Sequence, residues 1–308
     1  MKFSSSQNWL YILIAVIMLP ALLVNLGTMV FIDDEGIRAL VAQEMLWSGN
    51  FIAPTLHGDA YLNKPPLWNW ILVSSFFLWG ETTEWTARFP TVVALLSFAY
   101  TTYWFSHQIL GKKLAIIHAL TVITCGRMLF WDSMLALIDV CFSWVVYSQI
   151  MLLYHYGKKG QWWQAFGWAY LLCAVGFLLK GLPAIVFTGL TILALLWWTK
   201  SWIAFLKPAH LLSVVGCLLL LGIYYWQLSH YLDLHLIAER LFVESEKRTA
   251  ANFSLWDNVQ NLLAFPIEML YHFLPWTVLV IYFFQRGAWK KLKQNDGAAF
   301  MLVAFLVN

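Results

Sequence analysis

Residues 31–50 read FIDDEGIRALVAQEMLWSGN, and their first two residues end an apolar run from Trp9 to Ile32. About 20 helical residues cross the hydrocarbon core of a bilayer, so this run is long enough to be a membrane span. It exceeds the roughly 7–15 apolar residues of a secretory signal, which predicts an anchor that is not cleaved. The three carboxylates of Asp33–Glu35 therefore lie where the first helix leaves the membrane.

The remainder of this stretch has the spacing of an amphipathic helix. Its apolar residues recur every three or four positions, at Ile37, Leu40, Val41 and Met45. Arg38 and Glu44 are expected on the polar side of such a helix. The pattern predicts a helix that lies on the membrane interface and ends at a turn.

The composition of the whole chain excludes most classes of protein. Of the 308 residues, 61% are hydrophobic and 11% are charged, whereas an average soluble domain has roughly 25% charged residues. A single soluble core stops growing near about 250–300 residues, so this much apolar surface cannot be buried without a membrane. The four cysteines lie in apolar runs without CxxC spacing and are interpreted as small buried hydrophobes. We predict an all-α polytopic membrane protein.

Eight apolar runs are long enough to be interpreted as full membrane spans. They are Trp9–Ile32, Phe89–Ile109, Leu114–Trp131, Val140–Tyr154, Trp163–Leu179, Leu182–Trp198, Leu211–Leu228 and Pro266–Phe284. A last run, Ala298–Asn308, is too short and is interpreted as an incomplete span. Leu67–Trp79 would form a helix of only about 20 Å, which favours an interfacial position.

The distribution of charge predicts the orientation. With Leu67–Trp79 on the outer surface, the inner side holds 11 basic residues and one acidic residue, and the outer side holds 8 basic and 15 acidic residues. Cytoplasmic loops are enriched in Lys and Arg, so the N-terminus is predicted to be cytoplasmic. Two large outer loops then cover residues 33–87 and 229–265. Without a visible internal repeat or linker, residues 1–308 are predicted to form one transmembrane domain.

Spacing alone leaves two interpretations of the charges in the first outer loop. The carboxylates of Asp33–Glu35 are either a solvated helix start, where acidic residues are favoured, or include a general base at the mouth of a membrane cavity. Lys64, which precedes Pro65 and Pro66, is either a surface lysine that snorkels or a cation held rigidly to meet a phosphate.

The order of these motifs resembles the polyprenyl-phosphate-sugar-dependent glycosyltransferases of the GT-C fold. That family includes the aminoarabinose transferases that modify lipid A and the protein O-mannosyltransferases. The matching residues of the first loop are Asp34, Glu35, Ala42, Glu44, Met45, Ser48, Gly49, Asn50, Phe51, Pro54, Tyr61, Lys64, Pro65, Pro66 and Leu67. Arg88-Phe89-Pro90, Leu137-Ile138-Asp139 and Lys180-Gly181 are similar to later family motifs. The resemblance implies a GT-C-type helical bundle whose outer-face loop bears interfacial amphipathic helices.

The resemblance also implies roles for individual residues. Asp34 would be the general base that takes the proton of the acceptor hydroxyl, and Glu35 belongs to the same catalytic motif. The cations that would bind the donor phosphate, and stabilise the charge that develops on it, are Lys64, Arg88 and Lys180. Asp139 would orient the acceptor or a cation, and its alternative is a helix N-cap.

The second outer loop adds one candidate and argues against a metal. Arg248, next to Lys247, is interpreted as either a further ligand of the donor phosphate or a solvated charge. Some relatives place a Glu before the Lys-Pro motif and a His in the later outer loop as metal ligands. This chain has Asn63 and Ser245 there, so a divalent metal is not favoured and no cofactor is required.

The predicted function is the transfer of a sugar from an undecaprenyl (polyprenyl) phosphate carrier to a lipid, glycan or protein acceptor. The site would face the periplasm from a bacterial inner membrane, with membrane lipids as further partners and no nucleic acid. One alternative is a flippase or transporter for a lipid-linked sugar, although transporters place their charges near the midplane and commonly have repeated halves. The other is a non-catalytic, truncated family member, since family members are considerably longer.

Overall fold

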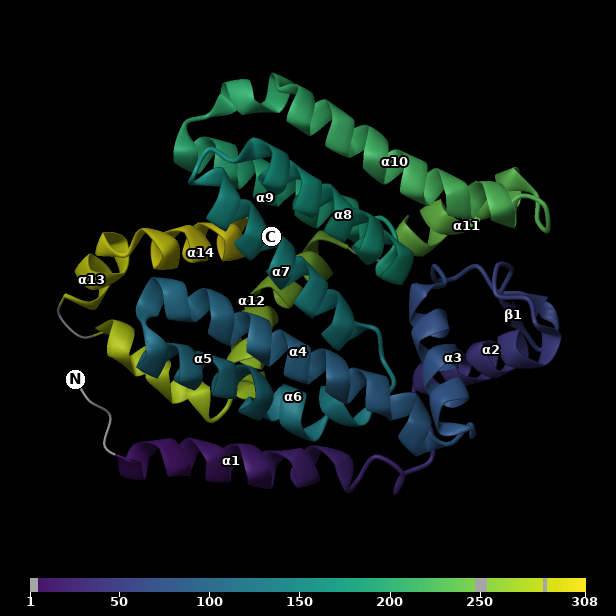
Figure 1. Ribbon diagram of the computed structural model, residues 1–308, viewed down its shortest axis with the longest axis horizontal. Coiled ribbons are helices and arrows are strands. Elements are labelled where there is room, and N and C mark those ends of the chain that lie inside the picture. The colour runs from purple at the N-terminus through teal and green to yellow at the C-terminus, as the bar shows by residue number, and fades with distance from the viewer. Residues whose placement is uncertain (1–4, 247–253, 285–286) are drawn as a thin grey trace.

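The computed structural model describes residues 5–246, 254–284 and 287–308 of the chain. Figure 1 shows a bundle of long helices with α2, α3 and a short hairpin gathered at one end. The bundle helices are α1 (Ser5–Leu23), α4 (Glu84–Leu110), α5 (Lys112–Thr124), α7 (Asp139–Gly157), α8 (Trp162–Lys180), α9 (Pro183–Thr199) and α10 (Pro208–Leu228). An all-α membrane architecture was the prediction from composition, and it is confirmed.

Shorter elements connect and cover the bundle. In the first long loop these are α2 (Glu35–Ser48), β1 (Thr55–Leu56), β2 (Asp59–Ala60) and α3 (Leu67–Trp79). Later in the chain they are α6 (Gly126–Phe130), η1 (Asp132–Met134), η2 (Trp202–Leu206), α11 (Leu234–Glu246), α12 (Leu255–His272), η4 (Trp276–Phe284), α13 (Ala288–Gln294) and α14 (Asp296–Val307). The β1–β2 hairpin is antiparallel, with Thr55 opposite Ala60.

Local sequence signals determine where several helices begin and end. The Thr83 hydroxyl accepts from the Thr86 amide in a capping box at the start of α4. Proline occupies the first turn of α9 and of α10, where its missing N–H costs nothing. Gly49 and Gly80 end α2 and α3 in the left-handed conformation, with φ of 68° and 71°.

Helices occupy seven of the eight predicted spans. Among the described residues, α8 and α10 are each long and apolar enough to cross a membrane, and α5 with residues 126–134 forms a third candidate bent by 44°. The apolar helix α9 is shorter, and so is α3, whose 13 residues match the predicted interfacial segment Leu67–Trp79.

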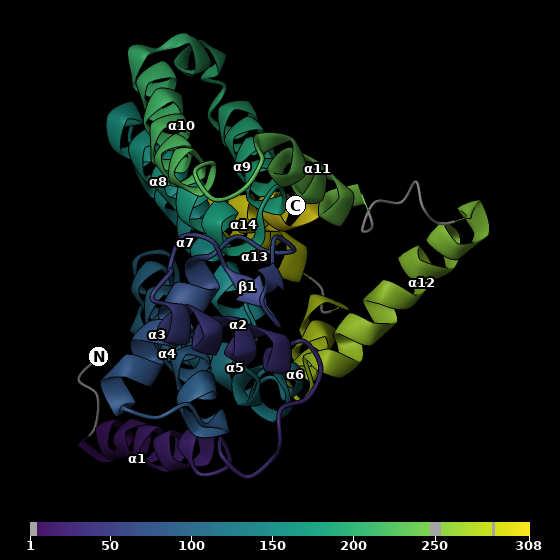
Figure 2. The same ribbon diagram turned by 90° about the vertical axis from the view of Figure 1, so that its right-hand side faces the viewer.

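The eighth predicted span, Pro266–Phe284, is wrong. Helix α12 ends at His272, and the 3₁₀ helix η4 begins only at Trp276. Pro275 between them has no N–H to continue a helix. The Leu274 carbonyl instead accepts from the Gly126 amide at 2.7 Å, a contact with a distant segment. Helix α12 already starts inside the predicted outer loop 229–265, and Figure 2 shows it projecting away from the bundle.

A buried apolar cluster holds the first loop against the bundle. Trp68 and Leu72 of α3 and Leu95 of α4 are fully buried in it. The Trp68 indole also donates to the Ala136 carbonyl at 3.0 Å, which joins α3 to the segment before α7. These contacts fix the start of α3, and therefore the Lys64-Pro-Pro segment that precedes it.

Helices α8 and α9 approach each other closely beside their connecting turn. A Cβ on Gly176 would lie 3.1 Å from the Ala184 Cβ, so a small residue is needed there. Gly181 forms the turn with φ of 81°. This packing fixes the end of α8 and therefore the position of the Lys180 backbone.

The two ends of the bundle differ in charge. The α4–α5 and α9–α10 connections, which carry Lys112, Lys113 and Lys207, lie at the end opposite α2 and α3 (Figure 1). The predicted site residues that the structure describes lie at the other end, at or near the connections beside α2 and α3. The structure therefore separates the basic loops from the acidic ones along the axis of the bundle.

Candidate active site

Four predicted site residues come from four separate connections at the α2–α3 end of the bundle (Figure 1). Asp34 directly precedes α2, Lys64 lies between β2 and α3, Asp139 is the first residue of α7, and Lys180 is the last residue of α8. They are far apart in the sequence, and only the fold brings these connections together.

Glu35 and Arg88 form a fully buried ion pair. The Arg88 Nη2 donates to Glu35 Oε1 at 2.6 Å, and its Nε donates to Oε2 at 3.0 Å. The two side chains are 0% and 1% exposed. The remaining donors of the guanidinium reach the backbone carbonyls of Leu26, Met29 and Val30 at 2.6 to 3.1 Å.

The Glu35 carboxylate also accepts two backbone hydrogen bonds. The Ile32 amide donates to it at 2.8 Å, and the Ala136 amide donates at 2.9 Å. Glu35 thus ties the segment between α1 and α2, helix α4 and the segment before α7 to one another. In this geometry Glu35 has no free face and Arg88 has no donor left for a phosphate, so we interpret the pair as structural. The catalytic role of Glu35 and the phosphate-binding role of Arg88 stay predictions.

Asp34, in contrast, presents its carboxylate to the outside. Its side chain is 53% exposed, and its ion-pair partner is Arg38, whose Nη2 lies 3.6 Å from Asp34 Oδ2. Arg38 also donates to the Tyr61 hydroxyl at 2.5 Å, and its guanidinium lies 5.6 Å from the centre of the Tyr61 ring.

The sequence analysis placed Arg38 on the polar side of α2, and this was wrong. Arg38 is only 3% exposed, because the hairpin folds over α2 and supplies Tyr61 as a partner. The spacing of apolar residues assigns a charged residue such as Arg38 to the solvent-facing side of a helix. It cannot show that Tyr61, 23 residues away, provides a buried hydrogen-bond partner. Arg38 now connects the Asp34 carboxylate to the segment that leads into Lys64.

Glu44 organises the hairpin that precedes Lys64. Its carboxylate accepts from the Thr55 hydroxyl at 2.6 Å and from the amides of His57 and Gly58 at 2.6 and 3.3 Å. The hydrogen bond from Thr55, helped by these amides, holds the pKa of Glu44 below its usual value. Glu44 belongs to the motif on which the family resemblance rests, and in the structure its carboxylate binds the turn of the hairpin.

We expect Glu44→Gln to loosen the hairpin. A lowered pKa in the folded state means that the ionised carboxylate contributes stability at neutral pH, and that this contribution is lost as the pH falls through the lowered pKa. In hydrogen-exchange mass spectrometry at neutral pH, amides of residues 55–62 should exchange faster in Glu44→Gln. The exposed Glu81→Gln should leave them unchanged, and equal exchange in both variants would contradict the assignment.

Lys64 and Lys180 come from neighbouring segments. A Cβ on Gly181 would lie 4.0 Å from Pro65 Cγ, so the turn after Lys180 abuts the residue after Lys64. Lys64 also lines a small hollow with Tyr224 and Tyr225 at the end of α10. The Tyr224 hydroxyl donates to the Ile52 carbonyl at 3.2 Å, which joins α10 to the same loop.

Asp139 and Lys180 form a third ion pair of the site. The Lys180 Nζ donates to Asp139 Oδ1 at 2.5 Å and lies 5.2 Å from the centre of the Phe142 ring. Asp139 does not cap α7, since Ile138 occupies the cap position without a side-chain hydrogen bond. The predicted N-cap alternative is therefore wrong, and the Asp139 side chain, 55% exposed, is directed at Lys180.

A large apolar cavity opens beside Lys180. Its volume is about 770 Å³, and its lining includes Phe142, Pro183, Phe187, Phe265, Met301 and Phe305. Lys180 is the one charged side chain among the residues that line it. The arrangement places a single cation at an otherwise apolar surface, which suits an amphiphile with one anionic group.

Two predictions remain, the phosphate-binding role of Arg248 and the question of a metal site. Arg248 lies outside the described residues. Among residues 5–246, 254–284 and 287–308, no group of three or more His, Cys, Asp or Glu side chains is placed to hold a metal ion.

The same arrangement of helices occurs in solved structures. The crystal structure of ArnT from Cupriavidus metallidurans in the apo state matches with a TM-score of 0.75 at 19% identity, over 98% of this chain and 54% of that chain. The structure of the same protein bound to undecaprenyl phosphate matches with a TM-score of 0.76 at 18% identity, with the same coverage. The fold defines this chain as a polytopic membrane protein of the GT-C class.

The family follows from the sequence. The profile of the family described as dolichyl-phosphate-mannose-protein mannosyltransferase matches residues 63–226, and the chain belongs to this family. It is similar to the undecaprenyl phosphate-alpha-4-amino-4-deoxy-L-arabinose arabinosyl transferase 2 of Pseudomonas fluorescens, with 28% identity over 64% of this chain and 36% of the relative. The enzyme of that name from Sodalis glossinidius is 28% identical over 87% of this chain and 48% of the relative. The chain therefore spans about a third to a half of the length of these relatives.

Proposed function

We propose that this chain carries the donor-binding and catalytic end of a membrane glycosyltransferase that uses a polyprenyl-phosphate sugar. The observation that carries the proposal is the Asp139–Lys180 pair beside an apolar cavity of about 770 Å³. Relatives and a fold neighbour support it, because their names refer to undecaprenyl phosphate as donor carrier or bound ligand.

The donor would bind with its chain in the apolar cavity and its phosphate at Lys180. Ionised side chains beside membrane spans are costly, so a lysine retained there has a functional partner by default. Asp139 orients the ammonium group. Lys64, which the Pro65–Gly181 contact places next to this turn, would approach the phosphate from the outer loop.

The reaction would be a direct displacement at the anomeric carbon. The acceptor oxygen forms a bond to that carbon as the bond to the phosphate oxygen breaks, and the polyprenyl phosphate leaves with the electron pair. Asp34 takes the proton from the acceptor hydroxyl, and Lys180 and Lys64 stabilise the phosphate charge that develops. Arg38 holds the Asp34 carboxylate from the protein side.

We place the site at the outer, periplasmic face, with the N-terminus in the cytoplasm. The support is the separation of basic connections from the acidic site along the bundle, since cytoplasmic loops are enriched in Lys and Arg. The acceptor would be a lipid, a glycan or a protein that carries a hydroxyl or another nucleophilic oxygen. Residues 1–308 would act in this as one transmembrane domain.

Lys180→Met tests the donor site directly. Removal of one hydrogen bond to a charged group costs about 1.5–3 kcal/mol, so the affinity for undecaprenyl phosphate in nanodiscs should fall about ten- to a hundredfold. The control is Lys113→Met, an exposed lysine at the opposite end of the bundle, which should bind normally. Equal affinities of both variants and the wild type would contradict the assignment.

A transfer assay separates the enzyme from a flippase. With radiolabelled polyprenyl-phosphate sugar in proteoliposomes, the proposal predicts that label moves to an acceptor extract and that undecaprenyl phosphate is released. Movement of the intact donor across the bilayer without transfer would overturn the proposal in favour of transport.

A further inference from the structure

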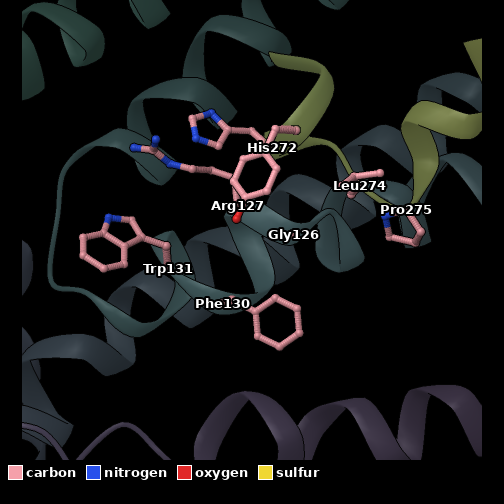
Figure 3. Close-up of a pocket in the computed structure, with 8 residues that line it drawn as sticks. Gly126, Arg127, Phe130, Trp131, His272, Leu274 and Pro275 are labelled. Atoms are coloured by element: carbon pink, nitrogen blue, oxygen red, sulfur yellow. The ribbon is translucent and has the colours of Figure 1, made fainter. Parts of the chain in front are cut away.

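A second pocket lies between α6 and the junction of α12 with η4. It has a volume of about 640 Å³, and both polar and aromatic side chains line it, among them Arg127, Trp131, Tyr271 and His272. Figure 3 shows the Arg127 guanidinium beside the His272 ring, with the Trp131 indole on the same side. None of these residues belongs to the site described above.

The walls of this pocket are fixed by contacts between distant segments. The Gly126 amide donates to the Leu274 carbonyl at 2.7 Å, and the Trp276 indole donates to the Thr124 hydroxyl at 2.8 Å. A Cβ on Gly126 would lie 3.2 Å from the Leu274 oxygen, so a glycine permits this approach. The pocket is therefore a built feature of the fold, formed where α6 meets the end of α12.

One polar atom at this pocket has no partner among the described residues. The His272 Nδ1 is buried and has no hydrogen bond within the described part of the chain, an arrangement that native proteins avoid unless a ligand or water completes it. The Arg127 Nε donates to both Asp132 oxygens at 3.1 and 3.2 Å. These are the hydrogen bonds of Arg127 in the described chain, and they orient the guanidinium while its two Nη groups stay available.

We propose that Arg127 and His272 bind a phosphate-class oxyanion. The paired Nη groups of an arginine match two oxygens of a phosphate, and a ring N–H of His272 supplies a third donor. Asp132 is buried and accepts from Nε, so it holds the guanidinium from behind. The rings of Trp131 and Tyr271 line the remaining space and suit a sugar or other ring that carries the phosphate.

This site is separate from the donor site but lies close to it. Asp132, the partner of Arg127, lies near both Asp139 and His272. Two anion sites would then lie near Asp139, one at Lys180 and one at Arg127. Two sources share the required chemistry: the headgroup of an acidic membrane lipid and a phosphate on the acceptor. The identification of the bound phosphate as part of the acceptor rests on the proposed function, whereas the existence of an anion site at Arg127 and His272 does not.

Chemical protection of Arg127 tests the site without a transfer assay. The full chain in phosphatidylcholine nanodiscs is treated with phenylglyoxal, and the modification of each arginine is followed by peptide mass spectrometry. Inorganic phosphate should slow the modification of Arg127 saturably, while chloride at matched ionic strength should not. The exposed Arg240 of α11 is the internal control and should react at the same rate throughout.

Two variants and two further ligands sharpen the result. His272→Phe should raise the half-protecting phosphate concentration about tenfold, the effect of losing one hydrogen bond to a charged group, and His272→Gln, which keeps a donor, should lose less. Protection in phosphatidylglycerol nanodiscs without added phosphate identifies a lipid headgroup as the occupant. Stronger protection by a soluble sugar phosphate than by phosphate identifies the acceptor.

Three outcomes would overturn the proposal. They are equal protection of Arg127 and Arg240, protection by a neutral methyl glycoside but by no anion, and phosphate protection unchanged in a folded His272→Phe. Thermal unfolding of the variant in detergent shows that it is folded. Because no step involves sugar transfer, failure here leaves the proposed function intact, and failure of transfer leaves this site intact.

Discussion

Asp34→Asn is expected to abolish sugar transfer while membrane insertion and folding stay normal. General-base catalysis by a positioned carboxylate contributes about 10²–10⁴-fold to a rate, so transfer should fall by that factor. The amide is the same size as the carboxylate but cannot accept the proton. Asp34 is half-exposed and has only a 3.6 Å contact to Arg38. In the variant the amide oxygen can still face Arg38, which also keeps its hydrogen bond to the Tyr61 hydroxyl, so the cost to folding should be small.

Asp33→Asn is the matched control for this prediction. Asp33 is the adjacent exposed aspartate and has a positive φ of 55°, a conformation that asparagine also adopts readily. Its variant should transfer sugar at close to the wild-type rate. Initial rates with a radiolabelled polyprenyl-phosphate sugar, measured in a full-length setting, give the comparison. Near-normal transfer by Asp34→Asn would remove Asp34 from the role of base.

Arg88→Met is expected to destabilise the protein by about 3–5 kcal/mol, the cost of leaving a buried charge without its partner. Glu35 would remain fully buried without its ion-pair partner, and three backbone carbonyls would lose their donor. The free energy of unfolding in detergent is the measurement. Lys158→Met removes one side of an ion pair whose side chains are 53% and 46% exposed, and it should cost only about 0–1 kcal/mol.

A second variant distinguishes a structural pair from a phosphate ligand. Adding Glu35→Gln to Arg88→Met should recover part of the lost stability, because no charge is then buried without a partner. If Arg88 instead contacts the donor phosphate, Arg88→Met should weaken undecaprenyl phosphate binding while the free energy of unfolding stays near the wild-type value. That result would support the role implied by the resemblance.

The two largest departures from the sequence analysis share one cause. Arg38 was placed on the polar face of α2, and Pro266–Phe284 was read as one continuous span. In both cases a distant segment supplies a hydrogen bond, from Arg38 to Tyr61 and from Gly126 to Leu274, and in the second case Pro275 also interrupts the helix locally. Periodicity and apolar length are properties of one segment, so neither of them predicts a hydrogen bond to a distant segment.

The division of the charged motifs into two groups also came from the fold. Asp34 and Glu35 are adjacent in the sequence and share one motif, yet one is half-exposed and the other is completely buried. Their side chains leave the start of α2 in different directions, and only the position of Arg88 on α4 shows which of them is enclosed. The pocket at Arg127 and His272 had no sequence signal, because its two halves lie about half the chain apart.

The sequence by itself determined the class of this protein, its helical runs, the short interfacial α3 and the order of the charged motifs. These follow from composition and local spacing, since apolar length and the cost of charge in a membrane act on each segment separately. Only the tertiary structure decided which charges are held within the protein and which face a cavity. Burial of a charge depends on partners supplied by other segments, and those partners meet only when the chain has folded.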